Sequence, residues 1–197
     1  MVTPALILAS QSPRRRELLQ QIGVPFRPLS VAVDEVPMVG EAPAQYVTRL
    51  AFTKAQAGRA SVGEKDLPVL GADTVVVCDD QILEKPENEA AAYAMWRRLS
   101  GRTHEVMTAV CLLKGEQCRQ ELSITEVQFW PLTEAQMAAY WATGECRDKA
   151  GGYAIQGLGA VFVKRISGSY SGVVGLPIEK LVPMLDALHL PYWQTTD

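Results

Sequence analysis

The sequence has few residues that bind metals through nitrogen or sulfur. Its 197 residues include only two histidines, His104 and His189, and four cysteines. The cysteines are widely spaced and form no Cys-x-x-Cys pair, the spacing typical of a structural zinc site. The pattern argues against such a site, and we expect reduced, partly buried thiols.

Long apolar runs, a secretory signal and a positive net charge are also lacking. No run approaches the roughly twenty apolar residues that cross a membrane, and the first ten residues have no basic segment and are too short for a signal peptide. The net charge of −3 argues against a general nucleic-acid binder, which is usually basic. The Walker sequence G-x-x-x-x-G-K-[ST] is absent, which argues against a motor or a kinase. We expect a cytoplasmic protein with neither a membrane nor a nucleic acid as its partner.

The order of the predicted elements indicates an α/β fold with a mixed sheet, because apolar runs typical of strands alternate with segments of helical period. Strands are predicted at residues 5–9, 26–33, 67–78 and, as two long strands with a turn at 114–117, over 104–132. Helices are predicted at 13–23, 42–60, 87–101, 133–144 and 176–188, with two further short strands around 154–175. No repeat or linker divides the chain, so we expect one domain over residues 1–197.

The first predicted helix begins in a way that suits a bound anion. Ser12 suits the N-cap, Pro13 the first helical position and Gly23 the stop. Helix N-termini carry partial positive charge and normally favour carboxylates, yet three arginines follow Pro13. Free backbone N–H groups, guanidinium groups and the hydroxyls of Ser10 and Ser12 together have the composition of a phosphate site. A solvated basic turn is the simpler alternative.

The three arginines are not equivalent on this helix. Arg15 lies one turn before Leu19, and Arg14 lies one turn before Leu18. Both are therefore expected at the mouth of the buried face. Arg16 lies on the other side and is expected to point to water.

A second anomaly is Asp73, a carboxylate inside the apolar stretch VLGADTVVV. Its neighbours predict burial, and an isolated buried carboxylate is too costly to keep without a cation. Candidates for the cation are Lys54, Lys85 and a divalent metal; the alternative is that Asp73 ends its strand in a solvated turn. A carboxylate near basic residues and an anion-binding helix start suggests phosphate chemistry, in which the carboxylate positions or deprotonates a water molecule.

A third stretch, DKAGGYAIQGLGA at residues 148–160, is rich in glycine. Glycines allow a backbone to approach a ligand closely, so the stretch suits a binding loop. A purely structural loop is the commoner explanation, and the sequence of the stretch alone leaves both open.

Eight motifs follow one another along the chain: LILASQSPRRRELL, VDE, RLAFTKA, LGADTVVV, LEKP, LSGRTHEVMTAV, DKAGGYAIQGLGAVFV and SGSYSGVVGLP. In this order they resemble the Maf family of nucleoside triphosphate pyrophosphatases over nearly the whole chain. The resemblance implies hydrolysis of a nucleoside triphosphate to the monophosphate and pyrophosphate with Mg²⁺ or Mn²⁺. It also implies a twisted mixed sheet with flanking helices, folded into two lobes around a deep cleft as in ITPase-like enzymes.

The resemblance also implies roles for particular residues. Asp73 falls on the position of the general base, and Glu35 on a second acidic position that, with Asp73, helps to hold the metal. Phosphate-binding positions fall on five residues: Ser10, Ser12, Arg15, Lys54 and Lys85.

Three further positions divide the family by substrate. Members that act on dTTP and UTP resemble this chain, which has Arg14, Thr74 and Gln156 there. Members that prefer 7-methyl-GTP have tryptophan, glutamine and glutamate instead. The resemblance therefore implies dTTP, UTP and modified pyrimidine nucleotides as substrates.

Two expectations concern partners and role. A homodimer is typical of the family, and Trp141 and Trp193 are candidates for its apolar contact surface or for the core. Members have also been associated with inhibition of septum formation. The alternative to an enzyme is therefore a regulatory protein that binds nucleotide as a ligand.

Overall fold

A computed structural model describes residues 3–62 and 67–194 of the chain. Within these residues seven strands form one sheet in the order β2-β1-β3-β5-β6-β7, with β4 paired to β3. The strands are β1 (Leu6–Ala9), β2 (Phe26–Leu29), β3 (Val69–Cys78), β4 (Gln81–Leu83), β5 (Thr103–Lys114), β6 (Gln117–Phe129) and β7 (Val163–Ser167). β1 runs parallel to β2 and β3, and the other pairs are antiparallel, which confirms the predicted α/β fold with a mixed sheet.

Six α-helices and two short 3₁₀ helices complete the described structure. They are α1 (Pro13–Gln21), α2 (Pro43–Ser61), α3 (Glu89–Leu99), α4 (Glu134–Ala142), η1 (Ala150–Gly152), η2 (Leu158–Phe162), α5 (Tyr170–Val174) and α6 (Ile178–Ala187). No helix in the described ranges combines the length and the apolar character that crossing a membrane would require.

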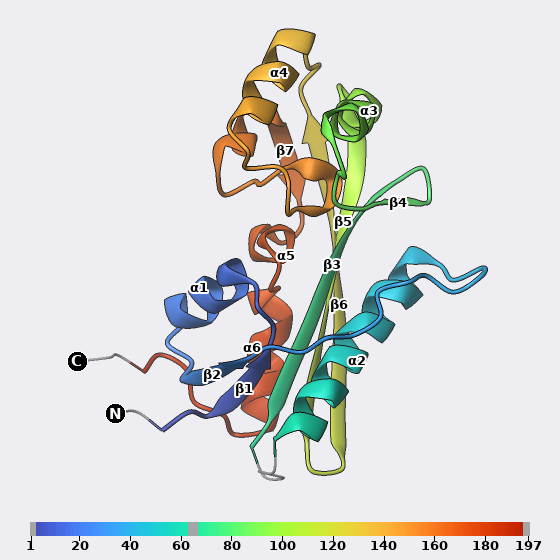
Figure 1. Ribbon diagram of the computed structural model, residues 1–197. Coiled ribbons are helices and arrows are strands. Elements are labelled where there is room, and N and C mark those ends of the chain that lie inside the picture. Colours follow the sequence, from blue (N-terminus) through green and yellow to red (C-terminus); the bar gives the residue numbers. More distant parts are fainter. Residues whose placement is uncertain (1–2, 63–66, 195–197) are drawn as a thin grey trace.

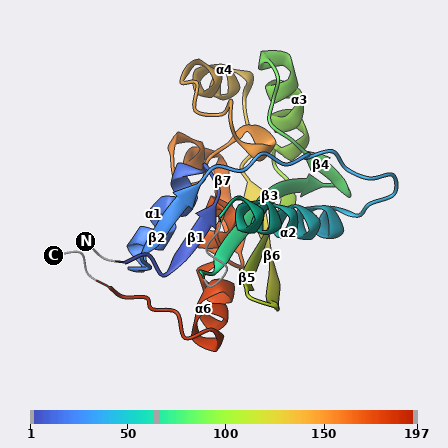
Figure 2. The same ribbon diagram turned by 60° about the horizontal axis from the view of Figure 1, so that its bottom comes forward.

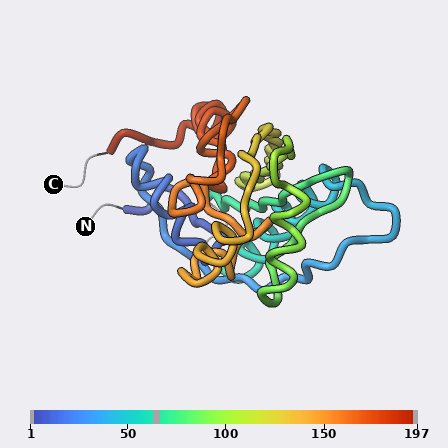
Figure 3. Tube along the Cα trace, turned by 90° about the horizontal axis from the view of Figure 1, so that it is seen from above, coloured from blue at the N-terminus to red at the C-terminus, as the bar shows by residue number. Residues whose placement is uncertain are grey.

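Figure 1 shows β3, β5 and β6 running the length of the molecule and connecting two lobes. The first lobe contains β1, β2, α1, α2 and α6. The second contains α3, α4, β7 and the 3₁₀ helices. The segment between β2 and α2 extends away from both lobes, as Figures 2 and 3 show from two other directions.

Strand β3 contributes side chains to both lobes along one face and packs against α2 with the other, because successive side chains of a strand point to opposite faces of the sheet. Leu70 and Ala72 belong to the apolar cluster under α1 and α6, and Val76 belongs to the cluster under α3 and α4. Val75 and Val77 point the other way and pack against α2. Thr74 faces the same side as Ala72 and Val76, so it lies where the first two clusters meet.

A row of hydroxyl groups crosses the sheet at that point. Thr74 pairs with Thr108 of β5, and Thr108 pairs with Ser123 of β6. The hydroxyl oxygens of Thr74 and Thr108 are 2.9 Å apart, and Thr108 donates to the carbonyl of Gly172 in α5 at 2.7 Å. Ser123 donates to Glu179 at 2.9 Å. This polar row separates the two apolar clusters, and α5 lies over it.

A glycine brings α2 very close to β3. A Cβ at Gly71 would lie 2.2 Å from the carbonyl oxygen of Ala51 and 2.6 Å from the nitrogen of Ala55. No side chain fits in that space. The close packing brings Lys54 of α2 next to Asp73, two residues after Gly71.

The predicted elements are mostly confirmed, with four corrections. The strand predicted at 26–33 ends at Leu29, and β4 was not predicted. Around 154–175 a single strand, β7, replaces the two expected, and η2 and α5 occupy the rest. Ser12 stands at the N-cap of α1, but its side chain makes no capping hydrogen bond.

Candidate active site

One pocket of about 620 Å³ lies between the lobes. Its lining comes from the start of α1, the middle of α2 and β3, the segment after β4, the glycine-rich stretch and the end of α5. All ten residues assigned to the site from the sequence contribute to this lining: Ser10, Ser12, Arg14, Arg15, Glu35, Lys54, Asp73, Thr74, Lys85 and Gln156.

Lys54 is the cation that Asp73 requires. Its ammonium nitrogen lies 2.6 Å from Asp73 Oδ1 and 2.6 Å from Glu35 Oε1. The side chains of Lys54 and Asp73 are 12% and 11% exposed, so the pair is largely removed from water. Asp73 reaches Lys54 because it belongs to the side of β3 that faces α2. Of the three candidates for the partner, Lys54 is confirmed.

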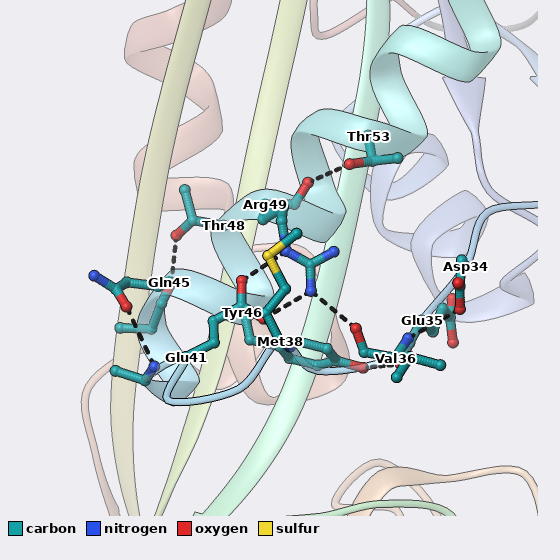
Figure 4. Close-up of polar contacts among 12 residues, drawn as sticks. Asp34, Glu35, Val36, Met38, Glu41, Gln45, Tyr46, Thr48, Arg49 and Thr53 are labelled. Atoms are coloured by element: carbon teal, nitrogen blue, oxygen red, sulfur yellow. Dashed lines mark hydrogen bonds and ion pairs between the residues drawn. The ribbon is translucent and has the colours of Figure 1, made fainter.

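Glu35 belongs to the long segment between β2 and α2, and α2 holds that segment in place. The hydroxyl of Tyr46 donates to the carbonyl of Glu35 at 2.6 Å. Arg49 binds both oxygens of Glu41 at 2.6 and 2.7 Å and donates to the carbonyl of Val36 (Figure 4). Partial burial favours a raised pKa for Glu35, but the hydrogen bond from Lys54 and the charges of Lys54, Lys85 and Arg15 together outweigh it, so the pKa lies below its ordinary value. Glu35 therefore faces the pocket as an anion.

Arg15 is held by three oxygen acceptors. Its Nε donates to the carbonyl of Gly175 at 2.9 Å, and its two terminal nitrogens donate to Ser10 Oγ and Thr74 Oγ1, each at 3.2 Å. Burial lowers the pKa of Arg15, while the charge of Asp73 opposes that shift. The network fixes a guanidinium group at the wall of the pocket.

The start of α1 supplies polar groups beside this guanidinium. Ser10 is buried, and its hydroxyl also accepts a hydrogen bond from the backbone nitrogen of Ser12 at 3.2 Å. Ser12 lacks a capping bond, which leaves its hydroxyl available at the helix N-terminus. Hydroxyls, backbone N–H groups and a fixed cation in one place suit the oxygens of a phosphate group.

The other two arginines differ from Arg15. Arg14 lines the pocket and lies 3.8 Å from Asp148. Arg16 is not among the lining residues, but the expectation that it points to water is wrong. It is half-buried, its guanidinium donates to the carbonyl of Gln11 at 3.1 Å, and its Nε is buried with no partner among the described residues.

The glycine-rich stretch forms the wall of the pocket on the side of the second lobe. Gln156 is exposed there, at the mouth of the pocket. Three side chains of the stretch that had not been singled out also line the pocket: Asp148, Lys149 and Tyr153. The repeated glycines were the available signal for them. The role of Lys85, which is exposed at the pocket wall, stays a prediction, as do the roles of the other nine residues.

The charges in the pocket fit a divalent metal that arrives with an anionic ligand. Five cationic and four anionic side chains line it: Arg14, Arg15, Lys54, Lys85, Lys149, Glu35, Asp73, Glu84 and Asp148. Such a nearly neutral lining leaves most of the charge of a triphosphate uncompensated. In the described ranges no three histidine, cysteine or acidic residues are grouped to hold a metal alone. The two carboxylates that share Lys54 are oxygen donors, and Mg²⁺ is commonly held by one or two carboxylates together with phosphate oxygens.

Comparison with known proteins connects this pocket to a family. Residues 5–188 match the family model described as Maf-like protein. A protein of Saccharophagus degradans named dTTP/UTP pyrophosphatase is 54% identical over 191 residues, which cover 96% of this chain and 91% of that protein. Proteins of the same name from Pseudoalteromonas atlantica and Alcanivorax borkumensis are 55% and 51% identical, cover 95% and 96% of this chain, and are each covered to 98%.

Proposed function

This chain belongs to the Maf family, and we propose that it hydrolyses dTTP and UTP to the nucleoside monophosphate and pyrophosphate. The observation that carries the proposal is the 54% identity, over nearly the whole chain, to a protein named dTTP/UTP pyrophosphatase. The gathering of a buried carboxylate, fixed cations and an exposed carboxamide in one pocket supports it. Modified pyrimidine nucleotides belong to the same substrate class.

The triphosphate is bound, in this proposal, at the start of α1. Arg15 is already oriented by three acceptors and loses little freedom when it binds a phosphate oxygen. The hydroxyls of Ser10 and Ser12 and the backbone N–H groups beside them add neutral donors. Lys85 approaches from the opposite wall, and its exposed ammonium group can follow the phosphates.

Asp73 acts as the base that takes a proton from the attacking water. Lys54 holds the carboxylate through one oxygen, Oδ1, so the other oxygen is available to the water. Asp73 and Glu35 would hold a divalent metal, Mg²⁺ or Mn²⁺, together with phosphate oxygens. When bound, the metal would offset negative charge on the phosphates during cleavage.

Three residues select the base in this proposal. The exposed carboxamide of Gln156 can pair at once with the N3–H and a carbonyl of uracil or thymine. Arg14 lines the pocket 3.8 Å from Asp148, where its guanidinium can contact the bound nucleotide. Thr74 accepts a hydrogen bond from Arg15 and so helps to position that guanidinium. Thr74 therefore affects selectivity indirectly, by determining where Arg15 meets the nucleotide.

The test is hydrolysis by the purified chain with Mg²⁺ or Mn²⁺. Ion-exchange chromatography should find UMP and pyrophosphate from UTP, and TMP and pyrophosphate from dTTP, with activity lost on chelation and restored by the metal. Release of UDP and inorganic phosphate would contradict the reaction type. Tight dTTP binding without turnover would favour a regulatory binding protein instead.

Asp73→Asn is the variant that tests the base. The amide keeps the shape of the side chain but cannot take the proton, so turnover should fall by about a hundredfold or more. Folding should be nearly unchanged, because Lys54 keeps Glu35 as a partner. The matched control is Asp80→Asn, an identical change at an exposed position outside the pocket. Near-normal turnover of Asp73→Asn would remove Asp73 from this role.

We further propose that residues 1–197 act as one domain, in the cytoplasm and without a nucleic acid. The lining of a single pocket extends from Ala9 to Gly175, which supports one functional unit. The net charge of −3 supports a small anionic substrate bound by local cations rather than a polyanion bound by the whole surface.

A further inference from the structure

The side chain proposed to read the base lies in a tight turn. The backbone nitrogen of Gly157 donates to the carbonyl of Ala154 at 3.2 Å, and Ile155 and Gln156 form the middle of the turn. Gln156 is exposed. Its place in the pocket therefore depends on what holds the two ends of the turn.

A single carboxylate holds the end that follows Gln156. Glu145 Oε1 accepts from the backbone nitrogen of Leu158 at 2.9 Å, and its Oε2 accepts from that of Gly159 at 3.0 Å. Both nitrogens belong to the first residues of η2. A Cβ at Gly157 would lie 2.1 Å from Glu145 Oε1, so the absence of a side chain there allows the carboxylate to approach.

Tyr140 connects the same carboxylate to the other end of the turn. Its hydroxyl donates to Glu145 Oε2 at 2.7 Å and accepts from the backbone nitrogen of Ala154 at 3.1 Å. The ring is fixed between Trp96 and Phe162, with ring centroids 5.4 and 4.9 Å away. The turn is thus held at both ends by one pair of side chains from α4 and the loop after it.

The pair has the charge state that this arrangement needs. Burial favours a raised pKa for Glu145, but the hydrogen bonds from Leu158, Tyr140 and Gly159 lower it below its ordinary value. Burial and the neighbouring carboxylate raise the pKa of Tyr140 above its ordinary value. At neutral pH an anion therefore accepts three hydrogen bonds, and a neutral hydroxyl can donate one of them.

We propose that Glu145, together with Tyr140, is a positioning residue for base selection: the pair fixes the turn that carries Gln156 and so determines which pyrimidine the enzyme accepts. Neither residue touches the nucleotide in this proposal. The inference rests on the proposed function, since it concerns how that same site selects its substrate. A loose turn would let the carboxamide rotate, and cytosine, which has an acceptor at N3 and a donor at N4, could then pair with it as well.

The experiment compares kcat/KM for UTP and CTP, which share ribose and phosphates and differ only in the base. Glu145→Gln has one oxygen where the turn needs two acceptors, so one backbone N–H loses its partner. We expect kcat/KM for UTP to fall about tenfold, mainly through KM, with that for CTP within about twofold of the wild type. The matched control is Glu134→Gln, a carboxylate on α4 that pairs with Arg97 at the surface and should behave as the wild type.

A double variant separates positioning from loss of structure. If Glu145 acts through Gln156, the UTP-to-CTP ratio of Glu145→Gln/Gln156→Ala should equal that of Gln156→Ala alone. Tyr140→Phe keeps the ring between its neighbours but removes the hydroxyl, and it should lower the UTP-to-CTP ratio of kcat/KM, as Glu145→Gln does. If Glu145→Gln does not fold, Tyr140→Phe tests the proposal instead.

Equal losses for UTP and CTP in Glu145→Gln and Tyr140→Phe would overturn the proposal, because they would indicate damage to the whole pocket. The proposal would also be overturned if the double variant lowered the UTP-to-CTP ratio of kcat/KM by the product of the two single effects, because Glu145 would then act independently of Gln156. A wild-type protein that hydrolyses neither UTP nor dTTP would instead refute the proposed function, and this inference with it.

Discussion

The guanidinium of Arg15 carries a positive charge that its hydrogen-bond partners do not neutralise. Its three acceptors are neutral oxygens, so none of them offsets the charge of the guanidinium, which stays available to a phosphate group. Arg15→Ala should raise KM for UTP by roughly ten- to a hundredfold, the size expected for a charge-assisted contact of about 1.5 to 3 kcal/mol. Steady-state kinetics with purified variants measures this.

Arg16→Ala is the matched control for that prediction. Arg16 bonds to the carbonyl of Gln11 and lies outside the pocket lining, so its loss should change KM by less than about threefold. If KM rose as much in Arg16→Ala as in Arg15→Ala, Arg16 would also contribute to substrate binding, and the assignment of this role to Arg15 alone would be wrong.

Gln156 offers a second prediction for a single side chain. Glutamate has acceptors only, so Gln156→Glu places a carboxylate against a carbonyl oxygen of uracil, whereas guanine presents two donors. An unpaired polar group of this kind costs about 1 to 3 kcal/mol, which corresponds to roughly five- to a hundredfold in selectivity. kcat/KM should fall for dTTP and UTP, and the UTP-to-GTP ratio should fall with it. An unchanged ratio would exclude Gln156 as the reader of the base.

Individual residues were predictable where local chemistry was unusual. Asp73 was predicted to have a cationic partner because a carboxylate among valines is costly to bury alone. The sequence left three candidates for that cation, and the packing of α2 on β3 identifies it as Lys54. Glu145 gave no such signal. It lies 11 residues before Gln156, and its function depends on a loop that returns to it.

The contact between α2 and β3 determines where Lys54 lies. Gly71→Ala would place a Cβ 2.2 Å from a backbone oxygen of α2, so the helix has to move away from the strand. Overpacking of this kind typically destabilises by about 1 to 3 kcal/mol. We expect a lower midpoint in urea unfolding and, because Lys54 moves away from Asp73, a lower kcat in the fraction that remains folded. If Gly71→Ala had the stability of the wild type, α2 could move away from β3 at little cost in free energy, and the prediction would be wrong.

Elements with a clear period were predictable, and those without one were not. Thr133 followed by Gln136 is the spacing of a capping box and predicts the start of α4, and both hydrogen bonds of the box are present. η2 and α5 have only five residues each, fewer than two turns, so no apolar face repeats within them. Their positions follow from tertiary contacts, such as those of Glu145 with η2 and of Thr108 with α5.

At the scale of the whole molecule, the row of hydroxyls explains why the pocket lies where it does. Apolar side chains fill the sheet on either side of Thr74 and Thr108, and the polar row between them leaves a place where a guanidinium can be buried. The two-lobed arrangement was implied by the family resemblance. The alternation of elements predicted the mixed sheet, but not that three strands would connect both lobes.

Trp141 and Trp193, the two candidates for a contact between copies of the chain, differ in exposure. Trp193 is 79% exposed, whereas Trp141 packs against the cluster under α3 and α4, and Arg147 lies 5.2 Å from its ring centroid. Trp193 is therefore the better candidate for a contact between copies of the chain, and the homodimer stays a prediction.

The stability of the whole fold should depend on pH through His104. This side chain is 3% exposed and contacts the hydroxyl of Tyr153 through Nε2 at 2.8 Å, while its Nδ1 is buried with no partner in the described part of the chain. Burial lowers the pKa of His104 from 6.5 to about 4. The unfolded chain therefore binds a proton that the folded chain does not, and stability falls as the pH decreases from about 6.5 to about 4.

The shift corresponds to about 3 kcal/mol over that interval. Carboxylates titrate there too, so the informative quantity is the difference between variants in urea unfolding at pH 7 and pH 4. His104→Gln can still bond to Tyr153 but does not titrate, and it should lose about that much of the pH dependence. His189→Asn, a change at the exposed histidine, should keep all of it. Equal pH dependence in the two variants would mean that His104 is protonated in the folded protein without cost, and that the apolar cluster around it opens to water.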